Sequence, residues 1–133
     1  MPATSYLRAK LGDHSIGKAA FTMPTTVYAA LFTADPTDAG SLTNEVTGGS
    51  YARVPITTAM GAFSLTTGIA TLTTDVNFPT PTANWGTVSY LALIDALTVG
   101  NMLYKEAIPL PRIIVSGGRA VRLKPGLFQI RLI

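Results

Sequence analysis

The residues of this chain that could carry acid–base or metal chemistry are few. His14 is the only histidine, and the chain has no cysteine and no G-x-S-x-G sequence. A Ser-His-Asp mechanism would therefore depend on His14 alone, and a zinc site would lack ligands. We interpret His14 as a surface or docking histidine, and we expect neither a metal nor a cofactor.

The carboxylates form no recognisable catalytic pattern. Asp35 and Asp38 lie in A-D-P-T-D-A-G, which lacks the alternating carboxylates and closing glutamate of an EF-hand, so we interpret them as turn residues. Asp75, Asp95 and Glu106 are too scattered to suggest a glycosidase pair. Phosphate-binding glycine motifs are absent from the sequence. We therefore expect no enzymatic activity; a hydrolase or carbohydrate-active enzyme is the alternative, and a deep polar pocket with His14 and two carboxylates would revive it.

Trp85 and the basic residues are the remaining candidates for binding. Trp85 either closes one end of the core, which we favour, or stacks on a sugar or a partner. From Lys105 onward the chain has six basic residues and one acidic residue, although its overall formal charge is only +3. These basic residues alternate with apolar ones, so a solvated face, contact with an acidic protein surface and contact with nucleic acid all stay open.

The composition favours a β-rich protein that packs against copies or partners. Only 13% of the residues are charged, against roughly one quarter in ordinary soluble domains. Threonine, serine and glycine supply much of the polar surface. No apolar run approaches the ~20 residues needed to span a bilayer, and the first residues do not resemble a signal peptide. We expect synthesis in the cytoplasm without export by a signal of its own.

The element around which the chain is organised is a predicted hairpin. Residues 88–94 and 102–108 are apolar runs joined by the polar, glycine-containing segment 95–101. Val88, Tyr90, Ala92 and Ile94 should face one way and Leu91 and Leu93 the other. Because both faces are apolar, this strand should be covered on two sides.

The rest of the chain predicts short strands separated by turns. Residues 26–33 should form a second central strand. Pro55 places the strand at 51–58, with Ala52, Val54 and Ile56 inward, at an edge or a bulge. Residues 63–65 and 69–78 should form a hairpin, with Ala70, Leu72, Val76 and Phe78 inward. A further strand is expected at 112–115, after a bend at Pro109 and Pro111. Residues 119–124 and 127–133 should form a C-terminal hairpin, with Val121, Leu123, Phe128, Ile130 and Leu132 inward.

A short helix at 5–11, capped by Ser5 and ended by Gly12, should precede these strands. The expected fold is all-β: a single-domain antiparallel β-sandwich or jelly-roll-like barrel with a short N-terminal helix. We expect residues 1–24 to form the helix and an arm, and residues 25–133 to form the β-sandwich domain.

Several segments together resemble a family of small virion proteins of tailed bacteriophages. They are S-Y-L-R-A-K-L-G-D-H near the N-terminus, V-Y-A-A-L-F-T-A-D-P-T-D-A-G from Val27, G-G-S-Y-A-R from Gly48, F-P-T-P-T-A-N-W-G from Phe78, L-A-L-I-D-A from Leu91 and the final G-L-F-Q-I-R-L-I. Members of that family are called tail fibre or phage structural proteins, and some resemble capsid decoration (cement) proteins. The resemblance covers nearly the whole chain, and the C-terminal hairpin is more basic here than in the family.

The resemblance implies a virion structural protein without catalytic residues. Because the chain is compact and lacks the long repeats of a fibre shaft, we expect a capsid decoration protein. It would assemble in the host cytoplasm, bind capsomer junctions on the head surface as a homotrimer and stabilise the shell. Its partners would be the major capsid protein and copies of itself, without a membrane or specific nucleic acid. The candidate contacts lie in the N-terminal segment and the basic hairpin: Tyr6, Leu7, Arg8, Lys10, Arg119, Arg122 and Lys124.

Two alternatives belong to other classes. A tail component, as a tube, baseplate or receptor-binding tip subunit, would be favoured by a native hexamer or by glycan binding. A cellular binding module unrelated to viruses is the other.

Overall fold

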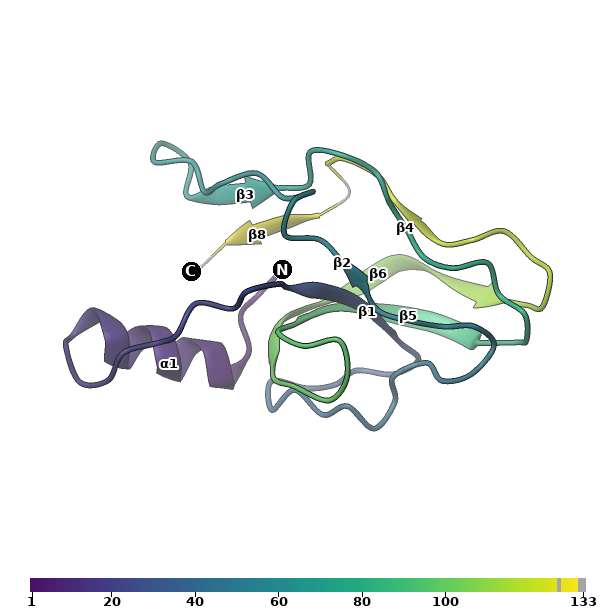
Figure 1. The fold of residues 1–133 in the computed structure, drawn as a ribbon, viewed down its shortest axis with the longest axis horizontal. Helices are drawn as coiled ribbons and strands as arrows, with labels where there is room; N and C mark the ends of the chain where they lie inside the picture. The colour runs from purple at the N-terminus through teal and green to yellow at the C-terminus, as the bar shows by residue number, and fades with distance from the viewer. Residues whose placement is uncertain (127, 132–133) are drawn as a thin grey trace.

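The computed structural model describes residues 1–126 and 128–131 as one helix and a set of antiparallel strands (Figure 1). The elements are α1 (Ser5–Ser15), β1 (Tyr28–Phe32), β2 (Val54–Pro55), β3 (Ile69–Thr71), β4 (Val76–Asn77), β5 (Gly86–Ile94), β6 (Met102–Ile114), β7 (Arg122–Leu123) and β8 (Gln129–Arg131). The expected all-β single domain with a short N-terminal helix is confirmed. Of the residues expected in the last strand, 127, 132 and 133 lie outside the described residues.

The largest sheet has four strands in the order β2-β1-β5-β6, all antiparallel. Its two interior strands are the ones predicted to be central, and β5 and β6 form the expected hairpin. β1 pairs with β5 from Tyr28 opposite Ile94 to Phe32 opposite Tyr90. Pro55 lies in β2 at the edge, where its missing N–H interrupts no interior hydrogen-bond ladder.

A second layer is a broken ribbon rather than two separate hairpins. β3 pairs with β8, and β4 pairs with β7, both antiparallel. The expected pairing of 119–124 with 127–133 is therefore wrong, because β7 and β8 pair with β4 and β3 instead. The hairpin expected from 63–65 and 69–78 forms in part, since Met60 bridges Leu72 and the Gly61 N–H donates to the Thr71 carbonyl at 2.9 Å. A turn does bring Ser64 to Ile69, whose carbonyl accepts a bond from the Ser64 N–H at 3.1 Å. The alternation of apolar residues gave the inward faces correctly, but alternation does not specify the partner strand.

The main core lies between the sheet and this ribbon, which runs above the sheet in Figure 1. The sheet contributes one face of each central strand, and the ribbon contributes the inward residues predicted for it. From the sheet come Ala29, Leu31, Val88, Leu91, Leu93, Leu103 and Ile114, and from the ribbon come Ala70, Leu72, Val76, Phe78, Leu123, Phe128 and Ile130. This two-layer packing is the arrangement expected of a sandwich.

Trp85 closes part of this core, as favoured from the sequence. Its side chain is 5% exposed, its Nε1–H donates to the Gly49 carbonyl at 3.0 Å, and its ring meets Tyr51 edge-on at 5.4 Å between centroids. Gly49 has φ of 58°, and a Cβ there would lie 2.8 Å from Trp85 Nε1. The glycine is therefore required both by its backbone conformation and by the close approach of the indole.

The opposite face of the sheet carries a smaller apolar cluster of Ala30, Phe32, Ala92, Ile94 and Met102. Leu42, from the loop after β1, and Tyr90, from β5, pack against it. Tyr90 and Ala92 were expected to share a face with Ile94, and they do. Val88 was expected there too, but it lies in the main core, because the pairing of β5 with β6 shifts register between Val88 and Tyr90.

The same shift corrects the predicted bend at Pro109 and Pro111. β6 continues through both prolines to Ile114. Arg112 pairs with Val88 and Ala107 with Tyr90, so the four residues 108–111 lie opposite the single residue Ser89 as an enlarged bulge. The prolines therefore sit where ladder bonds are already interrupted.

Arg53 is buried at a position where the sequence predicted an outward side chain. Ala52, expected inward, is exposed, whereas Arg53 is only 7% exposed. Its guanidinium donates from Nε and Nη2 to the two Glu45 carboxylate oxygens at 2.7 and 2.6 Å, and from Nη1 to the Ala96 and Val99 carbonyls, each at 2.8 Å. The ion pair raises the pKa of Arg53, so this buried group stays charged. Arg53 therefore joins the loop before β2 to the hairpin loop between β5 and β6.

The helix is longer than predicted and is capped one residue earlier. Thr4 is the N-cap, and its Oγ1 accepts from the Leu7 N–H at 3.4 Å. The helix passes through Gly12 and ends at Ser15. Gly12 has an ordinary negative φ and open space around it, so nothing at that residue forces the helix to stop.

Candidate protein-contact surfaces

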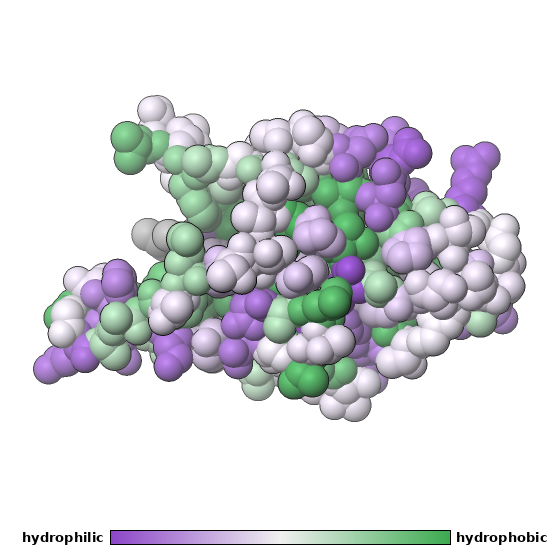
Figure 2. Space-filling view, viewed as in Figure 1, coloured by the Kyte–Doolittle hydropathy of each residue, from purple (hydrophilic) through white to green (hydrophobic). Residues whose placement is uncertain are grey.

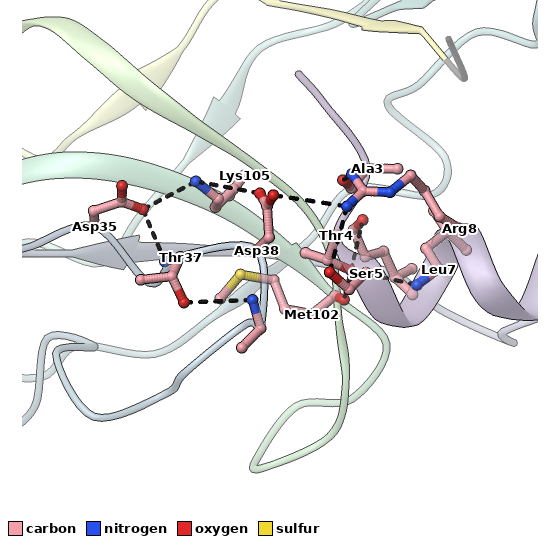
Figure 3. A network of polar contacts seen from close by, with 12 residues as sticks. Ala3, Thr4, Ser5, Leu7, Arg8, Asp35, Thr37, Asp38, Met102 and Lys105 are labelled. Atoms are coloured by element: carbon pink, nitrogen blue, oxygen red, sulfur yellow. Dashed lines mark hydrogen bonds and ion pairs between the residues drawn. The ribbon is translucent and has the colours of Figure 1, made fainter.

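The N-terminal segment is bound to the first half of β6 (Figure 3). The Thr4 N–H donates to the Leu103 carbonyl at 2.9 Å, and the Lys105 N–H donates to the Pro2 carbonyl at 3.3 Å. Thr4 is fully buried, and its hydroxyl donates to the Met102 carbonyl at 2.6 Å. Residues 2–4 thus continue the sheet beyond β6.

A chain of charged side chains connects this segment to the turn after β1 (Figure 3). Arg8 lies 3.6 Å from Asp38 and donates to the Ala3 carbonyl at 2.6 Å. Lys105 Nζ lies 3.0 Å from Asp35 and 3.9 Å from Asp38. Asp35 Oδ1 also accepts from the Thr37 N–H at 2.8 Å, and this bond, followed by the one from Lys105, lowers the pKa of Asp35. The predicted turn role is confirmed for Asp35, whereas the Asp38 carboxylate lies in the turn and pairs with Arg8 and Lys105.

The predicted contacts in the N-terminal segment differ in how much they present to a partner. Leu7 is 3% exposed and packs into the main core, and Arg8 is exposed but already paired with Asp38. Tyr6 is half-buried against the core, with Lys10 Nζ 5.8 Å from its ring centroid, and Lys10 is exposed. Contact of these residues with another protein stays a prediction, with Lys10 and Tyr6 the more accessible pair.

The predicted contacts in the basic segment all face outward. Arg119, Arg122 and Lys124 are exposed on either side of the buried Leu123. Arg122 Nε donates to Asn77 Oδ1 at 2.9 Å across the β4–β7 pair. The structure thus brings Arg122 to the ribbon surface, while Arg119 lies in the loop before β7 and Lys124 in the loop after it.

An apolar groove of about 270 Å³ opens between β6 and β7, and sequence analysis missed it. Its floor includes Leu31, Val88, Leu91 and Phe128, and its wall is the bulged segment 107–110 of β6. Arg112, Arg122 and Glu106 contribute charged groups to the lining. The only sequence signal was I-P-L-P-R-I-I-V from Ile108, whose prolines were interpreted as a bend.

The residues considered for catalysis are not brought together. His14 is exposed, and its Nδ1 accepts a hydrogen bond from the Phe21 N–H at 3.0 Å. Within residues 1–126 and 128–131, no group of three or more histidine, aspartate or glutamate side chains could hold a metal ion. Tyr51 donates to Glu45 at 2.8 Å and accepts from the Leu31 N–H at 3.0 Å, and burial raises its pKa. This tyrosine is therefore held protonated as part of the structure around Arg53.

The face of the molecule seen in Figure 2 has few strongly polar regions. Figure 2 shows large areas of intermediate hydropathy, with strongly hydrophilic residues gathered around α1 and around the β4–β7 ribbon among other places. Isolated hydrophobic residues interrupt the same face. In the part of the chain that the structure describes, no helix is long and apolar enough to cross a membrane.

Comparison with known families identifies the class of protein. No curated protein matches the chain in sequence. A family model described as Podophage GP4 fiber I protein gp80 matches residues 2–131, nearly the whole chain. The protein is therefore a structural component of a tailed-phage virion, as the sequence resemblance implied. The chain belongs to the fiber I protein gp80 family.

Proposed function

We propose that this protein is a non-enzymatic, tail-associated fibre component of the virion, which is the alternative set beside capsid decoration in the sequence analysis. The observation that carries this proposal is the match of residues 2–131 to a family described as a fibre protein. A fibre protein projects from a particle and must be attached to it. Contact surfaces, rather than a catalytic site, are the structural requirement of that role.

The fold suits attachment better than it suits a shaft. The main core lies between two layers, and the described strands, from two to thirteen residues long, form no repeated unit. A shaft would need an elongated, repetitive arrangement in which each unit packs mainly on its neighbours. We therefore assign this domain to the attachment or the tip of a fibre assembly, with homotrimerisation as one way of building it.

Capsid decoration remains a second candidate because the same compactness favours it. A globular subunit with a basic side can bind an acidic shell surface, and many weak contacts repeated over a shell add up to a large stabilisation. The major capsid protein would then be the partner, and the head surface the location.

The copy number of the protein per virion distinguishes the two candidates. Quantitative mass spectrometry of purified particles, with the major capsid protein as the internal standard, should find a few to some tens of copies. Hundreds of copies, near one per capsid subunit, would contradict the tail assignment and support decoration.

The proposed contacts can be tested in the same particles. Reversing the charges of Arg119, Arg122 and Lys124 should lower the occupancy of the protein, because the three side chains are exposed on the basic side. Removing residues 1–12 tests the N-terminal contacts, with the folded state of the shortened protein checked first. Unchanged occupancy in both variants would exclude these regions as the attachment surface.

A further inference from the structure

The groove between β6 and β7 combines three features. It is an apolar cavity with a buried floor, one wall is an exposed apolar ridge, and two arginines lie along it. Leu110, on this ridge, is 81% exposed. A contiguous apolar surface of this kind marks a contact site more often than a solvated surface.

The size of the groove indicates a side-chain anchor rather than a cofactor. Sites for drug-sized ligands usually occupy roughly 300–1,000 Å³, and this groove of about 270 Å³ lies just below that range. An engineered cavity of about 150 Å³ holds a benzene ring. One aromatic side chain or two aliphatic side chains from a partner would fit here.

The geometry of β6 excludes simple strand addition along this wall. An added strand needs a regular row of N–H and C=O groups, and Pro109 and Pro111 lack N–H groups within the bulge. Recognition must therefore come from side chains entering the groove and from charges at its rim.

The charges at the rim select an acidic partner. Arg112 and Arg122 are exposed and line the groove. The one carboxylate of the lining, Glu106, lies 3.8 Å from the N-terminal ammonium of Met1, which offsets its charge. The local field is therefore positive beside an apolar surface, and it favours apolar residues flanked by carboxylates.

We propose that the groove between β6 and β7 binds an extended segment of another virion protein, which places an apolar side chain in the groove and carboxylates against Arg112 and Arg122. This inference rests on the virion role for the identity of the partner, but the chemistry of the groove does not depend on whether the protein lies in the tail or on the head.

Peptide binding to the purified full-length chain tests the chemistry directly. The probes are three capped hexapeptides, DDFLDD, KKFLKK and DDSSDD, titrated while amide chemical shifts are followed by NMR. DDFLDD should shift the amides of Ile108, Val121 and Leu123 and should bind at least about tenfold more tightly than either other peptide, because only it supplies both the apolar anchor and the complementary charge.

Charge-reversed variants distinguish peptide binding at the groove from a general attraction due to the net charge of the protein. The double variant Arg112→Glu and Arg122→Glu should lose DDFLDD binding by about tenfold and gain KKFLKK binding at the same amides. The matched control, Arg119→Glu with Lys124→Glu, makes the same change in net charge outside the groove lining and should keep DDFLDD affinity within about threefold. Both variants should unfold within a few degrees of the parent, since all four side chains are exposed.

Several results would overturn the proposal. One is that millimolar DDFLDD causes no chemical-shift change at the amides around the groove, and another is that the two double variants lose the same affinity for DDFLDD. A third is that a single-stranded oligonucleotide binds as tightly as DDFLDD at the same amides. If concentrating the protein alone produced the same shifts, the occupant would be a second copy of the chain.

A photo-reactive residue at position 110 then identifies the partner in assembled particles. The cross-linked peptide should belong to a different virion protein and contain apolar residues flanked by carboxylates, and a cross-link to the same chain would contradict the proposal. Because copy number is measured independently, failure of the groove and failure of the tail assignment give different results.

Discussion

The outer edge of β6 is covered along the first half of the strand and uncovered along the second. From Met102 to Lys105 the edge is covered by the chain itself, through the backbone bonds of residues 2–4. Beyond Glu106, no hydrogen bond from another described segment reaches the outer edge, and two prolines remove donors there. Unpaired edges invite association, and prolines limit this to contacts made by side chains. The covered half is therefore closed by contacts within the chain, and the uncovered half leaves side chains free to contact a partner.

Removing the segment that covers the first half of β6 should have the largest effect on stability. Deleting residues 1–7 should lower the free energy of unfolding by more than about 2–5 kcal/mol, the usual cost of truncating one buried leucine such as Leu7, because the backbone bonds to β6 are lost as well. Urea unfolding followed by circular dichroism measures this. Should the shortened chain fail to fold, Leu7→Ala supplies the measurable value. An unchanged stability would mean that the segment is an independent arm.

The cap of α1 provides a smaller test of the same half. Thr4→Val should cost about 1–3 kcal/mol, because the Met102 carbonyl and the Leu7 N–H both lose the buried hydroxyl. Ser5→Ala is the control, since Ser5 is exposed and should change stability by less than about 0.5 kcal/mol. Thermal unfolding compares the two. If Ser5→Ala lowered the stability more than Thr4→Val, Ser5 would be the cap of the helix.

The charged contacts beside the covered half should appear as a pH dependence. The lowered pKa of Asp35 means that its contribution to stability is present above the ordinary aspartate value of 3.8 and is lost as the pH falls through the folded value. Asp35→Asn should therefore lower the melting temperature slightly near neutral pH, and the difference from the parent should shrink in acid. Melting curves between neutral pH and pH about 2 test this. A difference that is constant with pH would exclude the ion pair as its cause.

The uncovered half should show the smallest effect on stability. Leu110→Ser should change the free energy of unfolding by less than about 0.5 kcal/mol, because the side chain is 81% exposed. The same substitution should weaken binding of DDFLDD at the groove. A large loss of stability would show that Leu110 is part of the fold, and the contrast between the two halves of β6 would disappear.

The contact residues were predictable only in part, because exposure depends on packing between distant segments. The alternation in 119–124 correctly places Arg122 and Lys124 outward around Leu123. The N-terminal residues had no such alternation to interpret, and Leu7 is buried because the helix docks beside β6. The groove required β6 and β7 to come together, and no local pattern indicated that.

The central strands of the protein were predictable from the sequence alone. Predominantly apolar runs at 26–33 and 88–94 required burial on both faces, and the 95–101 segment required a reversal of the chain. The strands β1 and β5 and the start of β6 therefore followed from local chemistry. The family resemblance was also available from the sequence, and the match over residues 2–131 bears it out.

Strand pairing outside that centre and the burial of polar groups depend on contacts between distant segments, which the sequence pattern does not specify. β7 and β8 bond to β4 and β3, more than 40 residues away along the chain, because the two inward faces together cover the sheet. Arg53 is buried because Glu45 and two loop carbonyls satisfy its donors, an arrangement that exists only after three segments have met. Apolar alternation specifies the face of a strand, whereas its partners depend on contacts between segments that are distant in sequence.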